Sequence, residues 1–174
     1  DMKPRQAKEW IPDLALLTTS AKQDSPRGYS RETLLNMLRS TNQDVFEHSM
    51  HTAQIGKTLG HHLGLSPFDL TRLVLAAELH DLGKLYMDRE ILEKASPLTD
   101  YEIQQMRRHP IYGAQLVHHS AALRFLAPII LYHHERFDGR GYPIGLAGPE
   151  IPYLSRVLSI ADALSAMSSS RPYQ

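Results

Sequence analysis

The sequence contains no cysteine, no long apolar run and no excess of charge of either sign. Its 19 Lys and Arg residues balance 19 Asp and Glu residues, which argues against a broad basic surface for duplex nucleic acid or an anionic membrane. Without cysteine there is no disulfide, no thiolate metal site and no cysteine nucleophile, and we expect a cytoplasmic protein. No stretch of 18 apolar residues indicates a membrane span. An anionic ligand must therefore be held by a local site.

The length of 174 residues suits one domain with a sizeable core. Residues 1–29 are rich in proline and scattered polar residues, and we expect them to form a tether or a short helix. The domain proper is then predicted to cover residues 30–174. Ten histidines are many for such a chain.

Helical periodicity and capping residues recur along the chain, whereas no pair of alternating β runs flanks a tight turn. Ser30 and Ser66 are predicted caps, and Thr99 with Glu102 forms a predicted capping box. Residues 138–149 contain four glycines and two prolines, which predicts a loop. We expect an all-α bundle of about seven helices. They cover about residues 30–40, 44–63, 67–81, 99–108, 110 onwards, 121–134 and 152–167.

The central motif is Glu78-Leu79-His80-Asp81-Leu82-Gly83-Lys84, at the end of an apolar helical run. Adjacent helical residues point about 100° apart, so His80 and Asp81 share no face. They can converge at a helix end, where Gly83 lets the backbone turn and Lys84 returns to the same spot. An imidazole, a carboxylate able to bridge two cations and an ammonium suit phosphate chemistry. The His-Asp dipeptide alone has a simpler interpretation. It would mark a helix C-terminus, where His and Lys interact favourably with the helix dipole.

Further candidate ligands lie beside other apolar segments. Asp162 is the most informative candidate, because a carboxylate in an apolar helix needs a cation or hydrogen-bond donors around it. His109 precedes a proline and is predicted to begin a helix, facing inward. His133 and His134 end an apolar run, and a metal bound to both neutral rings removes their mutual repulsion. The doublets His61-His62 and His118-His119 have polar neighbours and are interpreted as solvated.

One helix offers two carboxylate–histidine pairs four residues apart, Asp44 with His48 and Glu47 with His51. Only one pair can face the core, and the apolar pattern does not choose between His48 and His51. Surface pairing is the simpler interpretation of both.

Imidazole and carboxylate ligands without sulfur suit iron, manganese or zinc, and two such ions suit hydrolysis of phosphate esters. In this hypothesis Asp81 bridges the two cations and Lys84 contacts a phosphate oxygen. No phosphate-binding loop of the Gly-x-x-x-x-Gly-Lys type and no Ser-His-Asp arrangement competes with it.

Taken together, these motifs resemble the HD-GYP family of bacterial cyclic di-GMP phosphodiesterases over about residues 44–174. His-Asp alone indicates only the wider HD superfamily, whereas His-His-Glu followed by Asp-Gly-x-Gly-Tyr-Pro is specific to this branch. The residues that carry the resemblance are His48, His80-Asp81, Gly83-Lys84, His109-Pro110, His133-His134-Glu135, Asp138-Gly139, Gly141-Tyr142-Pro143, Ile160-Ala161-Asp162 and Arg171-Pro172-Tyr173.

The resemblance settles the tie in favour of His48 and implies two metal sites. One metal would be held by His48, His80, Asp81 and Asp162, and the second by Asp81, His109, His133 and His134. Some family members bind a third metal through a glutamate, and here Asp44 stands at that position. His51 stands where the family usually has arginine. Family domains also continue for one or two helices past Arg-Pro-Tyr, so we expect the final helices to be missing from this chain.

The predicted function is therefore metal-dependent hydrolysis of cyclic di-GMP, with either linear pGpG or GMP as the end product. Arg140, Tyr142 and Arg171 are the expected substrate-binding residues beside Lys84. Expected partners are an upstream sensor or receiver domain, diguanylate cyclases and a second copy of the chain. The alternatives are a non-catalytic module that binds a cyclic dinucleotide or a partner domain, and an HD-type hydrolase of another nucleotide. The retained ligand set argues against the first and the Gly-Tyr-Pro loop against the second.

Overall fold

A computed structural model describes residues 28–168 of the chain. Most of the expected tether, and the Arg171-Pro172-Tyr173 segment, lie outside these residues. The described part is helical and contains no strand, only an isolated bridge between Asp138 and Ala147. The expected all-α class is confirmed. The α-helices are α2 (Arg31–Thr41), α3 (Gln43–His62), α4 (Pro67–Leu79), α5 (Arg89–Leu92), α6 (Asp100–Met106), α7 (His109–His118), α8 (Ala127–Leu131) and α9 (Tyr153–Ser168).

The predicted caps begin three of these helices. The hydroxyl of Ser30 accepts a hydrogen bond from the Thr33 N–H at the start of α2. Ser66 does the same for α4, where Pro67 fills the first turn and lacks the N–H that would otherwise need a partner. Thr99 and Glu102 form the reciprocal capping box of α6. Local sequence therefore fixes where these helices begin.

The segment 121–134 differs from the expected single helix. It is divided into a turn, the 3-10 helix η3 (Arg124–Leu126) and the short helix α8, and it ends in a turn at residues 132–134. Pro128 lies in the first turn of α8, where its missing N–H needs no partner, so it favours the start of a new helix over one continuous helix. The consequence is that His133 and His134 stand just past a helix end.

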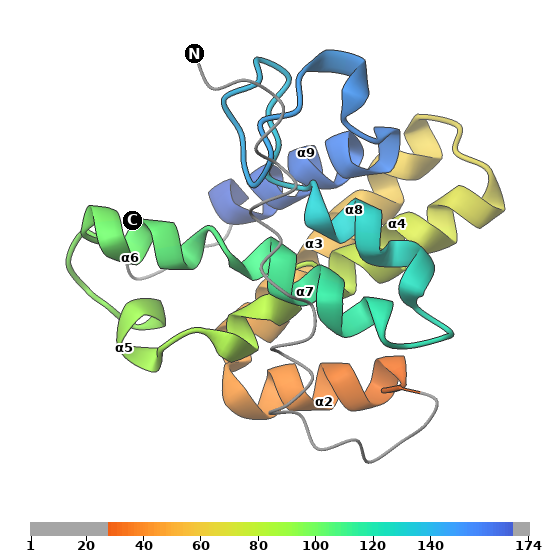
Figure 1. Cartoon of the computed structure of the whole chain (residues 1–174). Helices are drawn as coiled ribbons and strands as arrows, with labels where there is room; N and C mark the ends of the chain where they lie inside the picture. Colours follow the sequence, from red (N-terminus) through yellow and green to blue (C-terminus); the bar gives the residue numbers. More distant parts are fainter. Residues whose placement is uncertain (1–27, 169–174) are drawn as a thin grey trace.

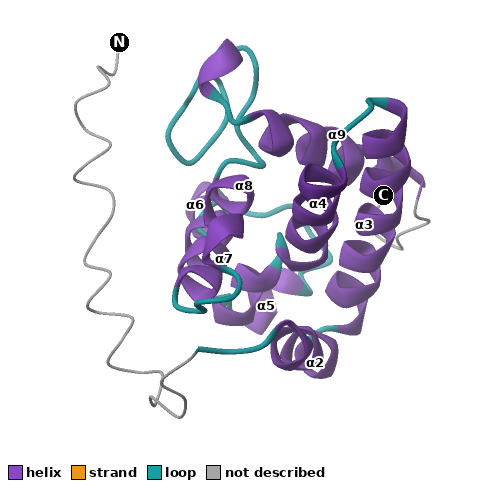
Figure 2. Cartoon of the chain, turned by 90° about the vertical axis from the view of Figure 1, so that its right-hand side faces the viewer, coloured by secondary structure: helices purple, strands orange, loops and turns teal. Residues whose placement is uncertain are grey.

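The long helix α3 packs against α4 and α9, while α7 packs against α8 and the 3-10 helix η2 (Leu82–Tyr86). Leucine and isoleucine side chains fill the space between them, each worth about 1.5–3 kcal/mol on full burial. The fully buried ones include Leu34, Leu38, Leu73, Leu79, Leu82, Leu126, Ile130 and Leu158. The loop that follows His134, with its 3-10 helix η4 (Gly148–Glu150), projects from the end of the bundle opposite α2 (Figures 1 and 2).

An ion pair joins α2 to the end of α4. Arg31 donates from Nε and Nη2 to the two carboxylate oxygens of Glu78, both at 2.6 Å. Glu78 is buried, and the two-point geometry satisfies both of its oxygens. The pair therefore fixes the last turn of α4 directly before His80. No helix among residues 28–168 is long and apolar enough to cross a bilayer.

Candidate metal centre

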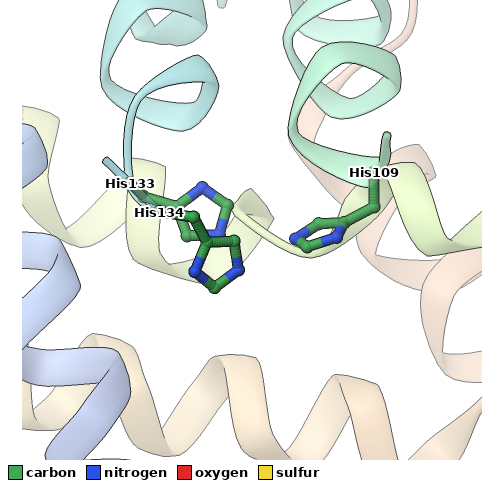
Figure 3. Close-up of side chains that lie close together, drawn as sticks. All are labelled: His109, His133 and His134. Carbon is green, nitrogen blue, oxygen red and sulfur yellow. The ribbon is translucent and has the colours of Figure 1, made fainter. Parts of the chain in front are cut away.

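Seven histidine and aspartate side chains converge from five parts of the fold. His48 lies on α3 and Asp162 on α9, while the others stand at helix ends: His80 and Asp81 follow α4, His109 begins α7, and His133 and His134 follow α8. Figure 3 shows His133 and His134 with rings turned toward that of His109. The ring centroids of His80 and His133 are 5.0 Å apart, and those of His109 and His134 are also 5.0 Å apart. Helix ends thus bring together residues that are far apart in sequence.

The potential ligand atoms fall into overlapping groups, each within 4.8 Å. The first group is His48, His80 and Asp162, and the second is His109, His133 and His134. The third group is His80, Asp81 and His133, which shares His80 with the first group and His133 with the second. Two nitrogen or oxygen atoms that each lie about 2.1 Å from one ion are at most about 4.2 Å apart. The 2.8 Å from His48 Nε2 to Asp162 Oδ1 and the 3.6 Å from His80 Nε2 to the same oxygen satisfy this condition.

Three of the histidines are oriented by the same kind of local hydrogen bond. The Nδ1–H of His80 donates to the Ala77 carbonyl at 2.8 Å. That of His109 donates to the Met106 carbonyl, and that of His133 to the Ile130 carbonyl, in each case three residues earlier. A carbonyl only accepts, so this contact places the ring proton on Nδ1 and leaves a lone pair on Nε2.

The Nε2 atoms of these three rings are buried. Among the described residues the Nε2 atoms of His80, His109 and His133 have no hydrogen-bond partner. A buried, oriented lone pair without a donor is costly in a purely structural role and is what a metal ion requires. The residues present therefore fit a divalent metal centre with nitrogen and oxygen ligands.

Asp81 lies between the two groups. Its Oδ1 is 3.3 Å from His109 Nε2, while its Oδ2 is 3.5 Å from His80 Nε2 and 3.9 Å from His48 Nε2. Lys84 donates to Oδ2 at 2.7 Å from the first turn of η2. The two oxygens of this carboxylate thus face different histidines, which is the arrangement a bridging ligand needs.

Electrostatics favour the metal-binding protonation states of most of these groups. His80 is the exception, because burial would lower its pKa but the Asp81 and Asp162 carboxylates raise it. Burial lowers the pKa of His109 to about 3 and that of His134 to about 4, and it also lowers the pKa of His133 well below its usual value. Burial alone would raise the pKa of Asp81, but the Lys84 and histidine charges hold it well below its usual value. Burial would likewise raise the pKa of Asp162, but the adjacent His48 and His80 rings together hold it below its usual value. Neutral imidazoles and ionised carboxylates are the metal-binding forms.

Gly83 has a different role from the one its sequence context suggests. Its backbone is not in the left-handed region that would make a sharp turn. A Cβ at this position would instead overlap the backbone carbonyl of His109 and the N–H of Gly113. The glycine therefore allows η2 to lie directly against the first turn of α7, which brings Asp81 within reach of His109.

Two sets of contacts hold the loop after His134 against the metal centre. The Tyr142 ring stacks on the His134 ring with centroids 4.8 Å apart, and the Arg107 guanidinium lies over the Tyr142 ring. Tyr142 N–H also donates to the His134 carbonyl at 3.2 Å. Tyr142 thus lies against one of the candidate ligands.

The second set of contacts is made by the buried carboxylate of Glu135, whose role was not predicted from the sequence. It accepts hydrogen bonds from the backbone N–H groups of Ile144, Gly145 and Leu146 at 2.7–3.1 Å. A glutamate directly after two candidate ligands and before a glycine-rich loop is the signal that could have indicated it. A carboxylate that satisfies three loop amides holds the loop in one conformation.

Other predicted site residues lie outside this cluster. Asp44 is exposed one turn before His48 and belongs to none of the three groups found in the described part of the chain. Arg140 is exposed, and its backbone N–H donates to Asp138. Arg171 lies outside the described residues. His61, His62, His118 and His119 are exposed, in agreement with their interpretation as solvated.

The sequence from residue 32 to residue 174 matches the model of the family described as HD domain. The chain belongs to the HD domain family. Membership of the HD family implies divalent-metal binding, for which the histidine and aspartate groups are suitable. It agrees with the resemblance that the sequence motifs indicated.

Named relatives extend this comparison. The chain is 38% identical over 153 residues to a cyclic di-GMP phosphodiesterase response regulator of Xanthomonas campestris, covering 83% of this chain and 39% of the relative. It is 35% identical to a 3'3'-cGAMP-specific phosphodiesterase of Vibrio cholerae, covering 73% of this chain and 28% of the relative. The chain thus spans well under half of the length of either relative.

The fold also has a solved counterpart. An HDG"Y"P protein from Bdellovibrio bacteriovorus superposes with a TM-score of 0.62 at 23% identity, covering 79% of this chain and 50% of that chain. This likeness shows that the helical arrangement is that of HD domains.

Proposed function

We propose that this chain is the catalytic domain of a phosphodiesterase that hydrolyses cyclic di-GMP with two divalent metal ions. The observation that carries the proposal is the position of Asp81, with one oxygen toward His109 and the other toward His80 and His48. The HD family membership and the relative named as a cyclic di-GMP phosphodiesterase support it.

In this proposal, His48, His80, Asp81 and Asp162 hold one ion, and Asp81, His109, His133 and His134 hold the other. Two ions held by these residues would supply an activated water and would screen the charge of the phosphodiester. Iron or manganese fits these nitrogen and oxygen ligands, as does zinc. A third ion at Asp44, which is exposed one turn before His48, stays a prediction from the family resemblance.

The chain's own groups would position the substrate. Lys84 is a partly buried ammonium beside Asp81, and it can donate to a phosphate oxygen there. Tyr142, held on the His134 ring, would form the wall that contacts a guanine or ribose. Arg140 and Arg171 would meet the second phosphate or a guanine edge, where a planar fork of donors suits either partner.

A hybrid cyclic dinucleotide is the second candidate substrate, because another relative is named as specific for 3'3'-cGAMP. The two substrates differ in one base, so the same metal centre serves either. The relative named as a response regulator supports an upstream receiver domain for the whole protein. A cytoplasmic location and a domain boundary at residue 30 remain predictions from the sequence.

The test of dinucleotide recognition compares two substrates on the same variants. We expect Tyr142→Ala to lower kcat/KM for cyclic di-GMP about tenfold, or about 1.4 kcal/mol, through lost transition-state binding. Hydrolysis of bis(p-nitrophenyl) phosphate, which offers no base or ribose, should change little. Tyr142→Phe keeps the ring on His134 and serves as the matched control. Equal loss of both activities in Tyr142→Ala would show that the loop only maintains the metal centre.

A further inference from the structure

His48 differs from His80, His109 and His133 in the partner of its Nδ1 atom. His80, His109 and His133 donate from Nδ1 to backbone carbonyls, which fix the position of the ring proton. The Nδ1 of His48 instead lies 3.1 Å from the hydroxyl oxygen of Ser165 on α9. A hydroxyl can donate or accept, so Ser165 by itself does not determine the tautomer of His48.

The tautomer matters because both nitrogens of His48 have partners. Its Nε2 is 2.8 Å from Asp162 Oδ1. With the ring proton on Nε2, His48 donates to Asp162 and has no lone pair on the metal side. With the proton on Nδ1, the Nε2 lone pair faces the same space as Asp162 and His80. The two forms therefore compete, and only the second can bind a metal.

A second histidine contacts the same serine. The Nδ1 of His51, one turn after His48 on α3, is 3.1 Å from Ser165 Oγ. Because the hydroxyl carries one hydrogen, it can donate to only one of the two rings. If it donates to His51 Nδ1, its oxygen can accept the Nδ1–H of His48, and both contacts are then satisfied with His48 in the metal-binding tautomer.

We propose that His51 and Ser165 form a hydrogen-bonded relay that keeps the proton of His48 on Nδ1 and so maintains His48 Nε2 as a metal ligand. The proton order is His48 Nδ1–H to Ser165 Oγ, and Ser165 Oγ–H to His51 Nδ1. His51 and Ser165 are positioning residues, since neither faces the metal groups. This inference rests on the two-metal centre proposed above and assigns a role to His51, which the sequence motifs left unexplained.

The experiment is a competition titration of the folded protein with Zn²⁺ against a chromogenic chelator, which resolves the affinities of the two ions. Outer partners of metal-binding histidines typically contribute about 10- to 100-fold in affinity. We expect Ser165→Ala and His51→Ala each to lower the affinity for one of the two ions by about this factor. The affinity for the other ion should not change. His51 is exposed, so His51→Ala tests the relay without altering the core.

Conservative variants separate a relay from mere packing. Ser165→Thr keeps the hydroxyl, and His51→Asn keeps an acceptor oxygen near the position of Nδ1, so both should restore the affinity of the weakened ion. His62→Ala, an exposed histidine of the same helix whose Nδ1 contacts the Thr58 carbonyl, and Ser168→Ala on α9 are the matched controls. Neither control substitution should change the affinity for either ion.

The outcomes distinguish this inference from the proposed function. If the unsubstituted protein binds no Zn²⁺, the two-metal centre itself is wrong. If it binds two ions and both alanine variants bind them with unchanged affinity, the relay is wrong while the centre stands. Equal weakening of both ions, without recovery in Ser165→Thr and His51→Asn, would also overturn the relay, because it would indicate a general structural role.

Discussion

The carboxylate of Glu135 accepts hydrogen bonds from the backbone N–H of Gly145 with both oxygens, at 3.1 and 3.0 Å. Glu135 directly follows the candidate ligands His133 and His134, so the contact ties the glycine-rich loop to the metal centre. Gly141 adds to this closeness, because a Cβ there would overlap the backbone of residues 135 and 136. These contacts attach the loop to the segment that carries the two histidines.

Replacing Glu135 should loosen this loop. In Glu135→Gln the charge is lost and an amide N–H₂ faces backbone donors, so hydrogen bonds to a charged group worth about 1.5–3 kcal/mol are weakened. We expect the amide hydrogens of Ile144, Gly145 and Leu146 to exchange at least about tenfold faster, as measured by hydrogen exchange. Glu150→Gln, which alters an exposed acceptor of the same loop, is the control. Unchanged exchange at all three amides would refute this role of Glu135.

Lys84 should affect catalysis more than metal binding. Its ammonium lies on Asp81 Oδ2 but is not itself a metal ligand. We expect Lys84→Ala to retain both ions and to lower kcat at least about tenfold, because a donor to the phosphate is removed. Elemental analysis and turnover of cyclic di-GMP measure the two effects. Lys94→Ala, which removes a lysine paired with Glu102, should change neither. A parallel loss of metal in Lys84→Ala would show a structural role.

Stability of the metal-free protein should fall as the pH drops below about 6.5. The pKa values of His109, His133 and His134 are lowered in the folded state, mainly by burial, so the unfolded chain binds more protons between pH 6.5 and about 4. These groups contribute stability that is present above pH 6.5 and is lost progressively below it. His80 opposes them, because Asp81 and Asp162 raise its pKa against the effect of burial.

Urea unfolding at pH 7, 6 and 5 in the presence of a chelator measures this dependence. Each additional proton bound by the unfolded chain lowers the free energy of unfolding by about 1.4 kcal/mol per pH unit. His109→Asn removes one of these groups and should flatten the slope. A free energy of unfolding that stays constant from pH 7 to pH 5 would contradict the assignment of buried neutral histidines.

Features encoded by a few adjacent residues could be predicted from the sequence. The caps at Ser30, Ser66 and Thr99 follow from local hydrogen bonding and the position of proline. The end of α4 was predicted less well, because the helix ends at Leu79 and not at the expected residue 81. His109 begins α7 as the following proline indicated. The single helix expected over 121–134 was wrong because the effect of Pro128 was underestimated.

Features that depend on packing between distant segments could not be predicted. Periodicity did not choose between His48 and His51, and in the structure both rings contact Ser165 because α3 packs against α9. The approach of Gly83 to α7 and the contacts of Glu135 with residues 144–146 likewise appear only once the chain is folded. The resemblance to a known family, rather than periodicity, selected His48.

The most direct test of the two-metal centre is the metal content of Asp81→Ala. Asp81 is the one residue assigned to both ions, so we expect elemental analysis to find two ions per chain in the unsubstituted protein and none in the variant, with no hydrolysis of cyclic di-GMP. His61→Ala and His118→Ala, which alter exposed histidines, should keep both ions. Circular dichroism confirms that each variant is folded. Full occupancy of both ions in folded Asp81→Ala would contradict the bridging role of Asp81 and with it the proposed centre.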